Sequence, residues 1–340
     1  MIKYLGSKRA LVPRIERIVR GLPVSSACDL FAGTTRVGQA LRGLGLHVLS
    51  NDTASYAEAF GRAYIERGER GRLPELLARL GAVVPRAGYV TETFCRRSRY
   101  FRPENGALVD AMRTELDRLE LDPVERGTLL TALIEAADRV DSTVGLQMAY
   151  LKKWAPRAHN ALELREPPLC PGPPGEVTRF DANELARQLD GIDLAYVDPP
   201  YNQHSYFANY HVWETIARGD EPEHYGTACK RLDCRTSKSP YNSKRAAWAA
   251  LEGLILSLAT PWLVLSFSDE GFHEPADLRA LLGERGHVGE VAVDSRRYVG
   301  AKIGIHNPRG EKVGSVSHLR NRELLFVVGP DRSAVESALS

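Results

Sequence analysis

The clearest indication of the fold is the octapeptide Leu194-Ala195-Tyr196-Val197-Asp198-Pro199-Pro200-Tyr201. Its four leading apolar residues predict a short strand that is buried on both faces, as strands of parallel sheets are. The two prolines end that strand, because proline lacks the N–H that a sheet ladder needs. In an open α/β sheet, ligands bind beyond the carboxyl ends of the strands. We therefore expect residues 198–201 to face a ligand cleft.

The residue types in this tetrapeptide suit the activation of an aromatic amine. Such an amine is a weak nucleophile, because its lone pair is delocalised into the ring. Hydrogen bonds from the amine to Asp198 and to a backbone carbonyl would localise that lone pair. Pro199 and Pro200 stiffen the loop that presents the carbonyl, since each φ is fixed. Tyr201 offers an aromatic face on which a flipped base could stack.

The second motif is the turn Asp29-Leu30-Phe31-Ala32-Gly33-Thr34-Thr35-Arg36-Val37-Gly38. A strand followed by a glycine turn and a helix lets the backbone at Gly33 approach a ligand closely. A phosphate-binding P-loop is disfavoured, because Gln39 and Ala40 stand where Lys and Ser or Thr would be needed. The G-x-G-x-x-G spacing of dinucleotide folds is also absent. S-adenosylmethionine, which has no phosphate, remains as the ligand.

Asp52 follows the next predicted strand, 47–50, and lies 19 residues after Gly33. An acid in this position accepts hydrogen bonds from ribose hydroxyls in doubly wound folds. An aspartate at a strand end also caps the helix that follows in many proteins. Both interpretations of Asp52 stay open from the sequence.

The pattern around these motifs predicts two α/β blocks on either side of a mainly helical region. Residues 53–175 carry apolar side chains at helical spacing, and the proline-rich run 167–175 predicts a boundary loop. Residues 1–52 and 176–340 would then be the two halves of one α/β domain. We expect helices at 11–20, 37–43, 76–80, 107–119, 124–140, 183–189 and 246–258, and strands at 27–31, 47–50, 177–180, 194–197, 262–267, 288–293 and 323–328.

Composition limits the class of protein. The 340 residues are 43% hydrophobic and 26% charged, which predicts a packed globular chain. The apolar runs are too short to span a bilayer, and no secretory signal is recognisable, so we expect a cytoplasmic protein without a membrane partner. Five cysteines without a CxxC pair favour neither a disulfide framework nor a zinc site, and no metal is expected.

The net charge of +2 says little, but the basic residues are unevenly distributed. Three basic stretches, at 94–102, 230–245 and 294–322, include aromatic residues, a combination that suits a nucleic-acid backbone. A solvated surface is the alternative for any single stretch. The candidate nucleic-acid contacts are Arg96, Arg97, Arg99, Lys238, Tyr241, Lys244, Arg296 and Arg297.

The motifs together resemble the Dam-type adenine-specific DNA methyltransferases, including the modification enzymes of type IIS restriction systems. Four pieces match in order: the N-terminal Lys3-Tyr4-Leu5-Gly6-Ser7-Lys8-Arg9, the glycine turn, Asn51-Asp52 and the Asp-Pro-Pro-Tyr tetrapeptide. The resemblance covers roughly half of the chain, the α/β part. It implies a Rossmann-like methyltransferase sheet, mostly parallel with one antiparallel strand, and a helical insert at 53–175 as candidate target-recognition region.

The resemblance also implies the site residues. Asp198, Pro199, Pro200 and Tyr201 would be catalytic. In one place the sequence departs from the family, because the donor turn reads Gly-Thr-Thr-Arg rather than a glycine-richer form. The S-adenosylmethionine site would comprise Tyr4, Lys8, Phe31, Gly33, Thr34, Asp52, Asp181 and Asp198.

The function implied is site-specific transfer of a methyl group from S-adenosylmethionine to N6 of a flipped adenine in double-stranded DNA. N4-cytosine methylation is the enzymatic alternative, although Asp198 is typical of adenine enzymes and cytosine enzymes tend to have serine there. Methylation of cytosine C5 would need a Pro-Cys pair, which is absent. A non-catalytic DNA-binding module with the same fold is the other alternative. The resemblance leaves room for a cognate restriction endonuclease that acts separately.

Overall fold

The apolar run Leu194–Val197 forms β4, the central strand of a seven-stranded sheet. The computed structural model describes residues 2–296, 305–306, 312–314 and 320–340. In spatial order the sheet consists of β3 (Glu176–Thr178), β2 (His47–Asn51), β1 (Ser26–Asp29), β4, β7 (Trp262–Ser268), β11 (Arg320–Gly329) and β8 (His287–Arg296).

Strand direction places the carboxyl ends of six strands, all except β11, at one edge of the sheet. The neighbours from β3 to β7 are all parallel, and β11 runs antiparallel to both β7 and β8. The predicted sheet, mostly parallel with one antiparallel strand, is confirmed. Because β11 runs the opposite way, its beginning lies at this same edge, where Glu323 pairs with Ser268.

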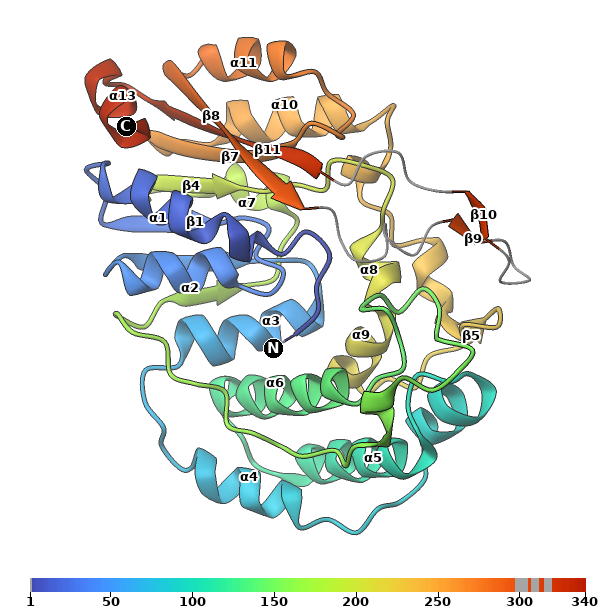
Figure 1. The fold of residues 1–340 in the computed structure, drawn as a ribbon. Coiled ribbons are helices and arrows are strands. Elements are labelled where there is room, and N and C mark those ends of the chain that lie inside the picture. Colours follow the sequence, from blue (N-terminus) through green and yellow to red (C-terminus); the bar gives the residue numbers. More distant parts are fainter. Residues whose placement is uncertain (1, 297–304, 307–311, 315–319) are drawn as a thin grey trace.

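Helices cover both faces of the sheet, which gives three layers (Figure 1). Side chains alternate along the strands, so that Tyr196 packs on one face and Val197 on the other. The first face is covered by α1 (Val12–Arg20), α2 (Arg36–Gly43) and α13 (Arg332–Leu339), and the second by α7 (Ala182–Ala186), α10 (Ala247–Ser257) and α11 (Pro275–Gly283).

A second group of helices lies beyond the β3 edge of the sheet, in the lower part of Figure 1. It confirms the helices predicted at 76–80, 107–119 and 124–140. The division of the chain at residues 53 and 175 remains a prediction. The group consists of α3 (Ser55–Gly61), a π-helical turn at Arg62–Glu66, α4 (Leu73–Gly81), a second π-helical turn at Thr91–Arg97, α5 (Pro103–Arg118), α6 (Pro123–Arg139) and α9 (His211–Arg218).

α9 was not predicted, and it follows the Asp-Pro-Pro-Tyr tetrapeptide rather than lying within residues 53–175. After the short helix α8 (Tyr206–Asn209), the chain crosses from the sheet to the helical group. There α9 packs against α3 and α6, with Trp213 buried between them. Two small hairpins complete the described chain, β5 (His224–Tyr225) with β6 (Lys230–Arg231) and β9 (Ile305–His306) with β10 (Lys312–Gly314).

No helix within residues 2–296 or the described later segments combines the length and apolarity that crossing a membrane requires.

The helical group has an apolar core of its own. Phe94, Tyr100 and Phe101 are all buried there. These three aromatic residues were interpreted from the sequence as part of a nucleic-acid surface. Their burial corrects that interpretation, because a ring inside the core has no face left for a base.

Candidate active site

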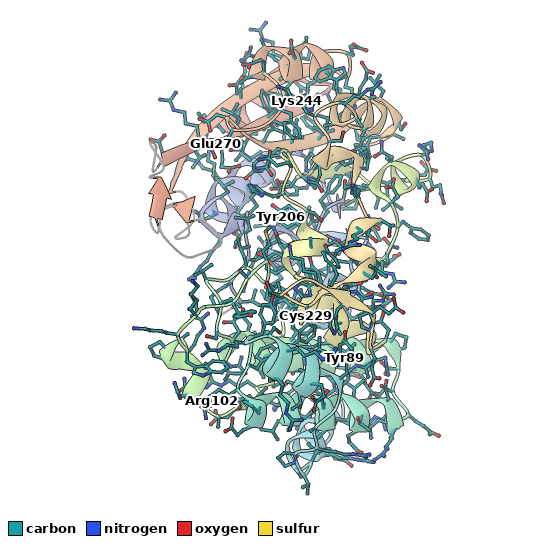
Figure 2. All side chains as sticks on the ribbon, turned by 90° about the vertical axis from the view of Figure 1, so that its right-hand side faces the viewer. Tyr89, Arg102, Tyr206, Cys229, Lys244 and Glu270 are labelled. Atoms are coloured by element: carbon teal, nitrogen blue, oxygen red, sulfur yellow. The ribbon has the colours of Figure 1, made fainter. Side chains whose placement is uncertain are left out.

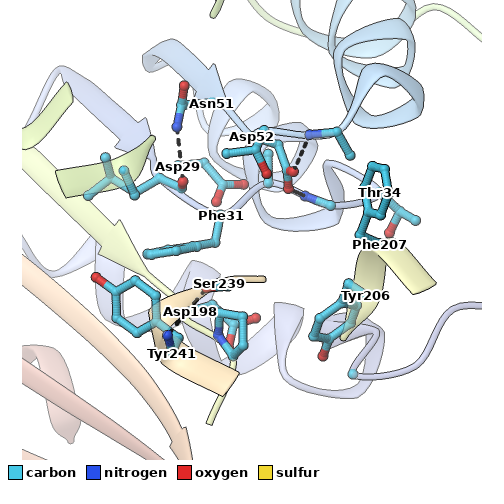
Figure 3. A pocket seen from close by; sticks show the side chains of 18 of the residues that line it. Asp29, Phe31, Thr34, Asn51, Asp52, Asp198, Tyr206, Phe207, Ser239 and Tyr241 are labelled. Atoms are coloured by element: carbon cyan, nitrogen blue, oxygen red, sulfur yellow. Dashed lines mark hydrogen bonds between the residues drawn. The ribbon is translucent and has the colours of Figure 1, made fainter. Parts of the chain in front are cut away.

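A cavity of about 320 Å³ opens at the edge where the parallel strands end (Figure 3). Its lining draws on four separate parts of the chain: the N-terminal segment, the turn after β1, the ends of β2 and β3, and the loops after β4. The predicted site residues in this lining are Tyr4, Lys8, Phe31, Gly33, Thr34, Asp52, Asp181, Asp198, Pro200, Lys238 and Tyr241. All eight residues expected at the donor site therefore border one cavity.

The glycine turn after β1 is shaped by Gly33 and Asp52. Gly33 has a φ of +50°, and a Cβ there would come within 3.0 Å of the Tyr4 hydroxyl, so a larger residue would crowd the turn. Asp52 Oδ2 accepts a hydrogen bond from the Gly33 N–H at 2.9 Å, and Oδ1 accepts one from the Ala54 N–H at 3.0 Å. Burial raises the pKa of Asp52. Asp52 thus ties the turn to the start of α3 and keeps lone pairs available for a ligand.

The departure from a glycine-richer turn is accommodated by Thr35. Its φ of 58° lies in the left-handed region, where a β-branched residue is strained. The Thr35 hydroxyl donates to the Thr34 carbonyl at 2.7 Å and accepts from Gln39 Nε2 at 2.9 Å. These local bonds hold the residue in a conformation that glycine would adopt without strain. Thr34, which is nearly buried, lines the cavity beside it.

Asp29 is a buried carboxyl group that the sequence did not single out. It ends β1, lines the cavity, and its Oδ2 accepts a hydrogen bond from the Gly38 N–H at 3.1 Å. Burial raises the pKa of Asp29 to about 7, and the nearby Asp198 adds to the rise. Its position as the first residue of the glycine-turn motif was the only signal in the sequence.

Asp198 follows β4 directly and forms an ion pair with Lys8, with 2.9 Å between its Oδ1 and Lys8 Nζ. A second carboxylate, Glu323, places its Oε2 3.7 Å from the same ammonium. Burial raises the pKa of Asp198 to about 6, although Lys8 opposes the rise. Burial lowers the pKa of Lys8, but Asp198 and Glu323 outweigh this effect and the net shift is upward. The site therefore contains a buried cation between two carboxylates.

Glu323 was missed by the sequence analysis, which placed it only as the start of a strand. The signal was a charged residue directly before the apolar run 324–328. A glutamate that begins a buried strand is desolvated and needs a partner. Nothing in the sequence indicated that the partner would be Lys8.

Of the other three catalytic candidates, Pro199, Pro200 and Tyr201, only Pro200 is among the residues that line the cavity. Pro200 lines the cavity, whereas Pro199 is buried behind it. Tyr201 packs against Phe267 with ring centroids 5.9 Å apart. The Tyr201 carbonyl accepts a hydrogen bond from the Phe272 N–H at 3.0 Å, which fixes the loop against the chain after β7.

An aromatic stack connects the cavity with the helical group. The Tyr4 ring is stacked between Tyr206, with centroids 5.5 Å apart, and Tyr210, at 4.5 Å, and Tyr210 stacks in turn on Trp213 at 4.6 Å. Tyr206 and Tyr4 both line the cavity. Figure 2 shows Tyr206 at a height between Lys244 in the sheet part and Arg102 in the helical part.

Residues 239–242 form one wall of the cavity, and they also hydrogen-bond to the loop that follows Tyr201. Tyr241 is buried, its ring meets Phe31 edge-on at 5.3 Å, and its hydroxyl donates to Asn183 Oδ1 at 2.7 Å (Figure 3). Asn242 Nδ2 donates to the carbonyls of Asn202 at 2.8 Å and His204 at 3.0 Å. Tyr241, a predicted nucleic-acid contact, is thus enclosed in the wall rather than displayed on the surface.

Asp181 lines the cavity and also caps a helix. Its Oδ1 accepts hydrogen bonds from the N–H groups of Asn183 at 2.9 Å and Glu184 at 3.2 Å at the start of α7. Phe180 beside it is half-exposed and borders the same cavity. The N-cap bonds fix the Asp181 backbone at the mouth without enclosing its side chain, which is exposed.

The predicted nucleic-acid residues are spread over both parts of the molecule. Arg96 pairs with Glu92, Arg97 lies 3.2 Å from His224 Nε2, and Arg99 lies over the Trp154 ring at 4.7 Å. Lys238 lines the cavity mouth, and both Lys238 and Lys244 are exposed. Arg297 lies outside the described residues, and Arg296 is described only as the last residue of β8.

In the described part of the chain, no group of three or more His, Cys, Asp or Glu side chains is placed to hold a metal ion.

Comparison with known proteins places these features in a family. Residues 4–280 match the family described as D12 class N6 adenine-specific DNA methyltransferase. The matched span includes the N-terminal segment, the glycine turn, Asp52 and the Asp-Pro-Pro-Tyr loop, and it ends before β8 and β11.

Several curated proteins are similar over most of this chain. It is 31% identical to type II methyltransferase M.NlaIII of Neisseria lactamica over 334 residues, which are 94% of this chain and 98% of that protein. Identity is 30% to modification methylase LlaI of Lactococcus lactis subsp. lactis, over 87% of this chain and 51% of that protein. The chain is 31% identical to type II methyltransferase M.FokI of Planomicrobium okeanokoites, over 84% of this chain and 47% of that protein. The chain thus spans about half of the two longer relatives.

Among solved structures, the chain aligns with magnesium protoporphyrin IX methyltransferase from Synechocystis PCC 6803, with a TM-score of 0.32 and 10% identity over 94% of this chain and 76% of that one. The family match and the relative of nearly equal length agree with the motifs that line the cavity. The chain belongs to the D12 class of N6 adenine-specific DNA methyltransferases.

Proposed function

We propose that this enzyme transfers a methyl group from S-adenosylmethionine to N6 of an adenine that is flipped out of duplex DNA, with Asp198 as the group that binds the target amine. The observation that carries the proposal is the single cavity shared by Asp198 and the glycine turn. A donor bound at the turn and an amine bound at Asp198 would therefore meet in one enclosed space.

The cavity fits the donor in size and in chemistry. About 320 Å³ is within the range of small-molecule sites. Gly33 lets the turn lie close to Tyr4, which a Cβ would crowd, and its N–H holds Asp52 at the cavity. We assign the ribose to Asp52, the methionine end to the turn at Phe31–Thr34 together with Tyr4, and the adenine to the neighbourhood of Asp181. When bound, S-adenosylmethionine supplies an electrophilic methyl group.

Asp198 would act on the target base through hydrogen bonding. As a carboxylate it accepts a hydrogen bond from the N6 amino group and localises the nitrogen lone pair. Pro199 and Pro200 hold the loop rigid, and the Tyr201 carbonyl is fixed by the Phe272 N–H. Because the loop is held before the base arrives, little ordering is needed when it binds.

Family membership decides between the alternatives that the sequence left open. The D12 class is specific for N6 of adenine, which selects adenine over N4 of cytosine. The non-catalytic alternative would predict a degenerate pocket, whereas the acids Asp52 and Asp198 both line the cavity here.

The DNA would lie across the side of the molecule seen in Figure 2. Figure 2 shows Lys244 on the sheet part, and Lys238 lines the cavity mouth. Arg97 ends the second π-helical turn of the helical group and Arg99 follows it, so we propose that phosphates are contacted on both sides of the cavity mouth. Reading of the target sequence by the helices within residues 53–175, action in the cytoplasm, and a separate cognate endonuclease also remain proposals.

The test is methyl transfer by the D198A variant. We expect it to lose at least about a hundredfold in the transfer of radiolabelled methyl to adenine, while donor binding by calorimetry and DNA binding persist. D190A is the matched control, because Asp190 is exposed and bonds only its neighbour Gly191 among the contacts described. Unchanged transfer by D198A, or label on cytosine in place of adenine, would contradict the proposal.

A further inference from the structure

Glu323 is a buried carboxylate to which the proposed reaction assigns no role. Its exposed fraction is 9%, and its Oε2 makes no hydrogen bond with the described residues. The nearest cation is Lys8, whose Nζ lies 3.7 Å away. A buried charge without a hydrogen bond costs stability, so an oxygen left in this state indicates a partner that is present only part of the time.

Lys8 contacts one of the two oxygens of Asp198, the carboxylate to which the target amine is proposed to bind. Its Nζ lies 2.9 Å from Asp198 Oδ1, within hydrogen-bond distance of the carboxylate that is expected to accept the adenine N–H. The Lys8 side chain is itself almost fully buried, at 6% exposure. In the proposed complex the base amine replaces the ammonium at Oδ1, and the displaced ammonium cannot be left unpaired inside the protein without a large penalty.

We propose that Glu323 is a positioning residue that receives the Lys8 ammonium when the target amine takes its place on Asp198. The inference rests on the proposed function, and it adds an acceptor for Lys8 within the same site. The movement is short, because a separation of 3.7 Å has to contract by less than 1 Å to become a charge-assisted hydrogen bond.

Among the described residues, no other carboxylate around Asp198 is an equivalent acceptor for Lys8. Asp29 already accepts a hydrogen bond from the Gly38 N–H, and burial together with Asp198 raises its pKa to about 7. The other groups that act on Asp198 or respond to it are uncharged phenols. The titratable groups facing Asp198 from the packed elements are Lys8, Asp29, Tyr196, Tyr201, Tyr206 and Glu323.

Two variants of Glu323 test the proposal. E323Q keeps the shape of the side chain and removes its charge, whereas E323D keeps the charge on a shorter chain. E290Q is the matched control, because Glu290 lies on the neighbouring strand β8 and pairs with Arg279. We expect kcat for adenine methylation to fall about tenfold to a hundredfold in E323Q, with the KM for DNA and the donor dissociation constant near wild-type values. E290Q should behave as the wild type.

The pH profile separates an effect on Asp198 and Lys8 from a general loss of folding. The negative charge of Glu323 favours the protonated form of Asp198, so removing it should shift the acid limb of kcat/KM to lower pH in E323Q. E323D should leave that limb in place. A defect in folding would lower the melting temperature and the active fraction without moving the limb.

A double mutant of Lys8 and Glu323 tests whether Glu323 acts through Lys8. If Glu323 acts through Lys8, E323Q should cost less in kcat in a K8M background than in the wild type. Wild-type kcat and an unmoved acid limb in E323Q would overturn the proposal, as would an equal loss with and without Lys8. Failure of the wild-type enzyme to methylate adenine would instead contradict the proposed function.

Discussion

In the proposed reaction Asp198 accepts a hydrogen bond from the target amine, and the ionised carboxylate is the stronger acceptor, so the pKa of Asp198 should set a lower pH limit for the reaction. Burial raises this pKa to about 6, with Lys8 opposing the rise. We expect kcat/KM to fall as the pH decreases through about 6, measured between pH 5 and 8 at constant ionic strength. An acid limb near the ordinary carboxyl pKa of about 4 would show that Asp198 is not the group that titrates.

Asp29 should make stability depend on pH in the opposite sense from a salt-bridged carboxylate. Its folded-state pKa is raised to about 7 by burial, above its unfolded value, so the folded state binds the proton more tightly. The stability contributed by the protonated form is complete below the unfolded pKa and is lost as pH rises through about 7.

D29N tests this expectation, because the amide is always neutral and keeps an oxygen for the Gly38 N–H. Its free energy of unfolding relative to the wild type should increase between pH 4 and pH 8, measured by urea denaturation at several pH values. A difference that stays constant with pH would show that Asp29 is ionised in the folded protein throughout this range.

Among the elements, the short 3-10 helix Pro240–Asn242 contacts both the turn after β1 and the loop that follows Tyr201. Tyr241 packs on Phe31, and the next residue, Asn242, donates to two carbonyls just after the tetrapeptide. We expect N242A to lower kcat about tenfold, since two hydrogen bonds that hold the loop are lost, while donor affinity changes little.

N160A is the control for that measurement, because Asn160 is an exposed asparagine in a loop of the helical group. Steady-state kinetics of both variants on the same DNA would give the comparison. Equal kcat values for N242A, N160A and the wild type would mean that the loop after the tetrapeptide is held by other contacts, such as that of the Phe272 N–H.

Strands and helices with a local signal were predictable, and contacts between distant segments were not. β4 and β7 are continuous apolar runs, and both lie where the sequence predicted them. α9 was missed, because His211 and Glu214 look polar in the sequence although both are buried. His211 Nε2 lies 2.9 Å from the Gln147 carbonyl, a partner 64 residues away that no local pattern reveals.

The same limit applies to the site. Every donor-site residue expected from the motifs borders the cavity, since motifs place residues at strand ends and strand ends share an edge. The basic stretches gave weaker guidance, because a cluster of arginines does not show which side chains already have partners. Arg96, for example, pairs with Glu92 one helical turn away.

At the scale of the whole molecule, DNA binding should depend on charges on both sides of the cavity mouth. We expect K244A to weaken DNA binding for all sequences alike and to reduce the slope of log K against log salt by about 1. Fluorescence anisotropy over a range of salt concentrations would measure this slope. R79A is the control, because Arg79 lies in α4, away from the cavity, and pairs with Glu115 of α5. An identical slope for K244A and the wild type would show that Lys244 does not contact the DNA.

The position of β11 has a consequence for how the enzyme is made. β11 follows β8 in the chain but lies between β7 and β8 in the sheet, and it carries Glu323 to within 3.7 Å of Lys8, which comes from the N-terminal segment. A ribosome releases the glycine turn and the tetrapeptide long before β11. Until β11 is inserted, β8 lacks the described strand with which it pairs, and Lys8 lacks its second carboxylate. A nascent chain would therefore complete the sheet and the charged cluster at Lys8 only after β11 has been synthesised.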